Sequence, residues 1–75
     1  MRDERLKILS KNIKAERVRK DLSQAELAFE VGVSYNTICQ VEQSRQMPSA
    51  MIVFDISRVL GISVDELFKN VSDKE

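Results

Sequence analysis

Residues 23–44 contain two helix starts, separated by a stretch so short that only a tight turn fits between the helices. Ser23 can cap the free N–H groups at a helix start, and Glu26 three positions later completes a capping box. Gly32 predicts the end of this helix, because glycine adopts a left-handed backbone without strain. Ser34 then predicts a second start. The segment is therefore predicted to form two short helices joined by a turn.

The apolar positions of these helices indicate which of their sides face outward. Leu27 and Val31 predict the buried side of the first helix, and Ile38 and Val41 predict that of the second. The other side of the second helix then carries polar groups, at Tyr35, Asn36, Cys39, Gln40 and Gln43. This spacing is the signature of a helix-turn-helix, which predicts that the chain reads double-stranded DNA.

Upstream of this pair, a first helix is predicted from Asp3 or Glu4 to about Arg19. Four residues recur at helical spacing along one side of this helix, namely Leu6, Leu9, Ile13 and Arg17.

The positive charge of the chain is concentrated near its start. Residues 1–22 hold eight Lys and Arg residues against four acidic residues, although the whole chain has a net charge of zero. A neutral chain argues mildly against a nucleic-acid binder, and this uneven distribution softens the objection. The basic block fits the solvated face of any surface helix equally well.

Downstream, Ser49 predicts the start of a fourth helix and Gly61 its end. Ser63 and Glu66 repeat the capping box and predict a fifth helix. No segment has a strand pattern. The 75 residues, of which 43% are apolar, are therefore predicted to form one all-α domain spanning residues 1–75.

The composition argues against several other classes of protein. No apolar run approaches the roughly 20 residues that span a membrane, so we expect a cytoplasmic protein without membrane association. The chain has no histidine and one cysteine, Cys39, which argues against an internal disulfide and a zinc site. It has no glycine-rich phosphate loop and no convincing constellation of catalytic side chains, so we expect neither an enzyme nor a cofactor or small-molecule ligand.

Over roughly residues 10–70 the chain resembles the Cro and repressor type of helix-turn-helix, also called the XRE family. Five positions of the motif match the family pattern: Gln24, Ala28, Gly32, Ile38 and Val41. The stretch MPSAMIVFDISRVLGISVDELF also resembles the usual ending of the family. The chain departs from the family in residues 1–9, which extend the first helix, and at Ser44, where many relatives have glycine. The resemblance implies a compact five-helix, lambda-repressor-like DNA-binding domain.

The resemblance implies base contacts from the start of the second motif helix, at Tyr35, Asn36, Thr37 and Gln40. Asparagine and glutamine amides can pair with N6 and N7 of adenine, so we expect Asn36 and Gln40 to carry specificity. Tyr35 can donate to a base or a phosphate and pack against a thymine methyl. For Thr37 two readings stay open, a methyl contact with a base and a hydroxyl bonded back into the helix. The alternative for Tyr35, Asn36 and Gln40 is that they are ordinary polar surface residues.

Phosphate contacts are predicted beside this row, at Gln24, Arg45, Asn12, Ser34 and Gln43. Gln24 is the strongest candidate, because a helix N-terminus offers N–H groups to anions. Ser34 is first of all a helix cap, and Lys11 and Lys20 are weaker candidates. Relatives pair the position of Arg17 with that of Glu42, so we expect a structural ion pair between them.

Several alternatives stay open at this point. Cys39 is either a small residue beside the groove or, less expectedly, a redox sensor, and Phe29 either folds over the core or belongs to a partner surface. We expect a transcriptional regulator that acts as a repressor and binds a palindromic operator as a homodimer, because one such unit reads only a few base pairs. Candidate dimer contacts are Phe54, Ile62, Val64, Phe68 and Val71, or Leu6 and Ile8. The alternative is a protein-interaction module, such as an antitoxin or a subunit of a complex.

Overall fold

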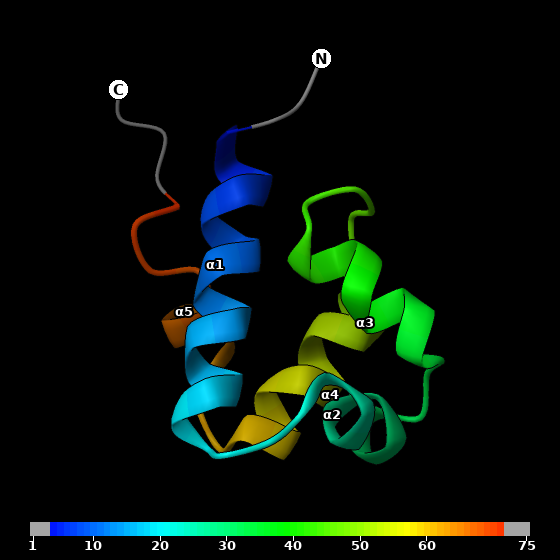
Figure 1. Ribbon diagram of the computed structural model, residues 1–75. Coiled ribbons are helices and arrows are strands. Elements are labelled where there is room, and N and C mark those ends of the chain that lie inside the picture. The colour runs from blue at the N-terminus through cyan, green and yellow to red at the C-terminus, as the bar shows by residue number, and fades with distance from the viewer. Residues whose placement is uncertain (1–3, 72–75) are drawn as a thin grey trace.

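The computed structural model describes residues 4–71, and within them the chain forms five helices and no strand (Figure 1). The helices are α1 (Glu4–Arg19), α2 (Gln24–Val31), α3 (Tyr35–Glu42), α4 (Ala50–Leu60) and α5 (Val64–Leu67). The predicted all-α architecture is therefore confirmed, and α1 begins at one of the two positions expected for it. In the part of the chain described, no helix is long and apolar enough to cross a membrane.

Serine hydroxyls cap the starts of α2, α3, α4 and α5, as the sequence predicts. Each hydroxyl accepts a hydrogen bond from the backbone N–H three residues later, at 2.9–3.2 Å, and the four serines are Ser23, Ser34, Ser49 and Ser63. In α2 the capping box is complete, because the Ser23 N–H also donates to Glu26 Oε1 at 2.8 Å. The helix starts are thus fixed by chemistry within four consecutive residues.

The helix ends rely on left-handed residues, only some of which are glycine. Gly32 and Gly61 have φ of 89° and 71°, as predicted from the sequence. Asp21, Ser44 and Asn70 also have positive φ, between 62° and 66°, and the sequence did not predict them. At Ser44 the chain closes the end of α3 with two backbone bonds, Ser44 N–H to Val41 O at 3.1 Å and Arg45 N–H to Gln40 O at 2.9 Å. This pair of bonds is a Schellman motif, in which a glycine is usual.

One hydrophobic core joins the helices. Its buried members are Leu9, Ile13, Leu27, Ala28, Ile38, Val41, Val53, Ile56, Leu60 and Leu67. Helix α2 packs against α3 and α4, while α1 contacts α3, α4 and α5. Figure 1 shows α3 at one edge of the molecule, with α5 at the other and α1 and α4 between them. The core therefore holds α3 along one side only, and its other side is left at the surface.

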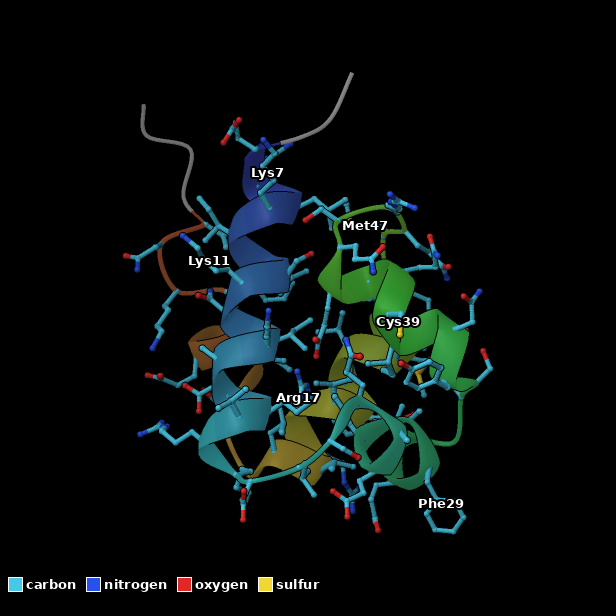
Figure 2. The ribbon with its side chains drawn as sticks, in the orientation of Figure 1. Lys7, Lys11, Arg17, Phe29, Cys39 and Met47 are labelled. Carbon is cyan, nitrogen blue, oxygen red and sulfur yellow. The ribbon has the colours of Figure 1, made fainter. Side chains whose placement is uncertain are left out.

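Phe29 lies outside this core. Its side chain is 82% exposed, and Figure 2 shows it projecting from α2 away from the rest of the molecule. The alternative in which Phe29 folds over the core is therefore wrong. Its exposure leaves the partner-surface alternative in place.

Candidate nucleic-acid interface

Helix α3 is anchored on its inner side and open on its outer side. Ile38 and Val41 are completely buried in the core. The turn from α2 passes through Gly32 to Val33, which is partly buried against the core. The predicted roles of these residues as turn and core positions agree with this geometry. Because the inner side is packed tightly, the outer side has a fixed orientation relative to the rest of the molecule.

The predicted base-contact residues gather on the outer side of α3. Tyr35 is 56% exposed, Asn36 is also exposed, and Thr37 and Gln40 are partly buried. Thr37 Oγ1 lies 2.9 Å from Ser34 Oγ, so its hydroxyl is engaged at the helix start. Asn36 and Gln40 are four positions apart and share one face of the helix, which brings their amides to neighbouring places on the surface.

This outer side carries no charge of its own. The only ionisable carboxylate within α3 is that of Glu42, whose side chain is 2% exposed and paired with Arg17. Arg45 follows α3 in the exposed part of the next loop. An uncharged polar surface with a cation beside it can read hydrogen-bonding groups on bases while the cation meets a phosphate.

Arg17 and Glu42 form the ion pair expected from the sequence. Arg17 Nε lies 2.7 Å from Glu42 Oε2, and Arg17 Nη2 donates to Glu42 Oε1 at 3.2 Å. Arg17 Nη1 also donates to the Leu22 carbonyl oxygen at 2.7 Å. Figure 2 shows Arg17 projecting from α1 toward the interior of the molecule. The pair ties α1 to the last turn of α3 and to the connection that leads into α2.

Gln24, at the start of α2, joins the same group of side chains. Its Nε2 donates to Glu42 Oε1 at 3.0 Å, and its Oε1 accepts a hydrogen bond from Cys39 Sγ at 3.6 Å. Interaction with the Cys39 side chain, one helical turn later, raises the pKa of the Tyr35 phenol above its usual range. The phenol is therefore protonated at neutral pH and can act as a donor. The sequence placed Cys39 beside the groove but gave no sign of these contacts.

Among the predicted phosphate contacts, Gln43 and Ser34 are exposed near the two ends of α3. The Ser34 hydroxyl caps α3 and is also bonded to Thr37, in agreement with its first predicted role. Gln24 keeps one side-chain N–H beyond its bond to Glu42. Together with Arg45, these residues border the outer side of α3 at several points.

The prediction for Asn12 needs correction. Both N–H groups of its amide are used within the fold, since Nδ2 donates to the Leu67 and Lys69 carbonyl oxygens, each at 2.8 Å. The side chain therefore ties α1 to the end of α5, which lies across the molecule from α3 (Figure 1). Asn12 is therefore a structural residue, and these bonds argue against its predicted contact with a phosphate. Figure 2 likewise shows Lys11 on the side of α1 turned away from α3.

Nothing in residues 4–71 points to a metal centre, because no group of three or more His, Cys, Asp or Glu side chains converges there. The site is a surface made of hydrogen-bonding groups. A short helix held by a preceding helix across a glycine turn, with uncharged polar groups outward, defines the helix-turn-helix class of DNA-binding transcription regulators.

Comparison with known proteins identifies the family. The helix-turn-helix family matches residues 13–67, and the chain belongs to this family, in its XRE type. YazB of Bacillus subtilis, an HTH-type transcriptional regulator, is 37% identical over 60 residues, which cover 80% of this chain and 87% of YazB. The predicted family is thereby confirmed.

Two solved structures are similar over most of their length. The restriction-modification controller protein C.AhdI from Aeromonas hydrophila has a TM-score of 0.81 and 28% identity, over 84% of this chain and 96% of C.AhdI. The DNA-binding domain of the P22 C2 repressor has a TM-score of 0.78 and 31% identity, over 89% of this chain and 90% of that domain. The predicted lambda-repressor-like fold is confirmed by these likenesses.

Proposed function

We propose that the protein is a transcriptional repressor that binds a palindromic operator as a homodimer, with α3 of each copy in the major groove. The outer side of α3 is the observation that carries this proposal. It presents Tyr35, Asn36 and Gln40 on a helix whose inner side is fully buried. A helix about 10–12 Å wide fits the major groove, which is about 12 Å across. Occupying a promoter in this way would exclude polymerase without any further domain.

Two copies supply the specificity that one lacks. Helix α3 has 8 residues and at about 1.5 Å per residue can follow only a few base pairs. A two-fold dimer places two recognition helices about 34–36 Å apart, one turn of DNA, so the operator repeats its half-site. The likeness to the P22 C2 repressor domain and to the controller protein C.AhdI supports a regulator that acts by binding DNA.

We propose the outer side of α4 and the loop before it as the contact between the copies. Met51 and Phe54 are 66% and 47% exposed, and their spacing of three positions within α4 places them on one face of that helix. Met47, in the loop before α4, is 58% exposed. Of the other residues predicted for this contact, Val64 and Phe68 are exposed, Leu6 is buried, and three are partly buried, Ile8, Ile62 and Val71. Exposed apolar side chains of this kind are a common feature of interfaces.

The proposal is tested by selecting DNA. Purified protein is mixed with a fragmented double-stranded pool at about 0.15 M salt, and the retained DNA is sequenced. We expect an inverted repeat with half-site centres about ten base pairs apart. Gln40→Ala should lose about 5- to 150-fold in preference at one position of each half-site, equivalent to about 1–3 kcal/mol. Phe29→Ala, an exposed change outside α3, is the control and should select the same repeat.

Retention without a shared sequence would refute specific reading by α3. The exposed Phe29 then favours the second function, a protein-interaction module such as an antitoxin or a complex subunit. In that case Phe29→Ala should weaken capture of the protein partner, whereas Gln40→Ala should leave it unchanged. The same two variants therefore separate the two functions.

A further inference from the structure

Two side chains of the α3 helix hold the amide of Gln24, at the start of α2. Gln24 Nε2 donates to Glu42 Oε1 at 3.0 Å, and Gln24 Oε1 accepts a hydrogen bond from Cys39 Sγ at 3.6 Å. The Glu42 carboxylate is itself held by Arg17, whose Nε and Nη2 donate to its two oxygens at 2.7 Å and 3.2 Å. The Gln24 amide therefore has a bonded neighbour at each of its two ends.

The two hydrogen bonds fix the amide of Gln24 together, and neither does so alone. A carboxylate can only accept, so the NH₂ group faces Glu42 and the carbonyl oxygen faces the thiol of Cys39. With the bond to Glu42 alone, the planar amide could still turn about the N–H···O axis. The bond from Cys39 removes this freedom, because it holds the carbonyl oxygen. The direction of the second N–H of the NH₂ group is then set as well.

That second N–H lies at a helix end with other donors to spare. The hydrogen bonds among residues 4–71 use one of the two N–H groups on Gln24 Nε2, and the side chain is partly exposed. Gln24 is also the first residue of α2, and the first backbone N–H groups of a helix have no acceptor within it. Backbone and side-chain donors thus meet at one place, where a phosphate can accept from both.

We propose that Cys39 is a positioning residue that holds the Gln24 carbonyl oxygen and so orients the amide to donate to a phosphate of the DNA backbone. This role rests on the proposed binding of DNA by the two motif helices. Cys39 acts through Gln24 and does not itself contact the DNA. A donor that is oriented before binding loses less conformational entropy on contact, which raises affinity. Because a phosphate carries no sequence information, base preference is unaffected.

The first test needs no DNA and follows the side-chain amide signals of Gln24 in the ¹⁵N–¹H NMR spectrum of the whole chain. Gln43 and Gln46 are exposed, so their side chains supply the reference for a solvated amide in the same spectrum. We expect Cys39→Ala to move the Gln24 signals toward that reference. Cys39→Ser keeps a donor and should retain much of the native position. The control Phe29→Ala should change nothing.

The second test measures affinity for the operator that the unaltered protein selects. Cys39→Ala should weaken binding about threefold, the size expected for one weak hydrogen bond, and Cys39→Ser should restore most of the loss. In the background of Gln24→Ala, Cys39→Ala should have no further effect, because no amide is left to orient. A merely structural cysteine would lower the affinity in both backgrounds.

The third test locates the phosphate. Each phosphate of the operator is replaced in turn by a neutral methylphosphonate. At one position of each half-site the unaltered protein and Cys39→Ala should then bind equally well, because the contact that distinguishes them has been removed. At every other position the threefold difference should persist.

Each outcome bears on the role of Cys39. Unchanged Gln24 signals in Cys39→Ala overturn the positioning. Equal losses in both backgrounds, a difference that persists at every methylphosphonate position, or an altered base preference also overturn it, in favour of a structural role. If the unaltered protein selects no sequence, the proposed function fails and the phosphate contact fails with it. The NMR signals then still decide whether Cys39 orients Gln24.

Discussion

Removing one partner of the Arg17–Glu42 pair should destabilise the protein far more than an ordinary surface change. The Arg17 and Glu42 side chains are 10% and 2% exposed, so solvent screens the pair very little. In Arg17→Met the Glu42 carboxylate stays buried with only Gln24 as a donor, and the Leu22 carbonyl oxygen loses its 2.7 Å bond. Breaking a buried pair in this way costs about 3–5 kcal/mol.

The loss should be visible in thermal unfolding followed by circular dichroism. For a domain of this size, each kcal/mol lowers Tm by about 4–8 °C, so Arg17→Met should lower Tm by at least about 12 °C. DNA binding should fail at the temperature where the variant unfolds, and it should be normal well below that temperature. The defect would then be one of stability, since Arg17 lies inside the molecule.

A double variant tests the reasoning directly. Arg17→Met combined with Glu42→Leu leaves no stranded charge, so its free energy of unfolding should lie within about 1–2 kcal/mol of the unaltered protein. The half-buried Gln24 amide can then bond to water. The reasoning is refuted if Arg17→Met alone costs less than about 1 kcal/mol, or if the double variant costs as much as the two single changes added together.

Four further predictions concern single positions. Ser44→Gly should raise the free energy of unfolding by about 0.5–1 kcal/mol in urea titrations, because glycine relieves the strain of a φ of 62°; a lower stability would contradict this. Phe54→Glu should give a folded monomer in sedimentation, since the ring is 47% exposed and lies beside Arg58; an intact dimer would rule out this contact. Arg45→Ala should weaken binding to all sequences and reduce the salt dependence by about one unit, whereas the control Lys11→Ala should not, and equal effects would remove Arg45 from the phosphate contacts. Asn12→Ala should cost about 1–2 kcal/mol of stability and leave the salt dependence unchanged, because both of its bonds lie within the fold.

The sequence predicted the helix starts better than the helix ends. A serine cap and its partner N–H lie within four residues, so their chemistry is visible in a short stretch such as Ser23 to Glu26. Gly32 and Gly61 likewise predict positions with a left-handed backbone. Asp21 and Ser44 do not predict a left-handed backbone, because an aspartate or a serine adopts positive φ only where the packing of the following segment requires it. The end of α3 at Ser44 therefore depends on the tertiary structure.

The role of a side chain was predictable where the family pattern or the helical spacing indicated it. The Arg17–Glu42 pair was expected because relatives pair these positions, and the outward row of α3 was expected from its period. The role of Asn12 depends on carbonyl groups 55 and 57 positions later, and that of Cys39 on Gln24, 15 positions earlier. Neither contact can be predicted from the local sequence, because both arise from how the helices pack.

The two sides of α3 differ in how freely their residues can be substituted. Ile38, Val41 and Glu42 hold the helix in place, whereas Asn36 and Gln40 do not take part in the core. If those two amides read the operator as proposed, a duplicated copy of this gene could acquire a new target by exchanging them, with little effect on folding. Glu42 is different, because its carboxylate is bonded to both Arg17 and Gln24. Exchange at that position would favour matching changes at Arg17 and Gln24, so these three residues should vary together as new regulators arise from this scaffold.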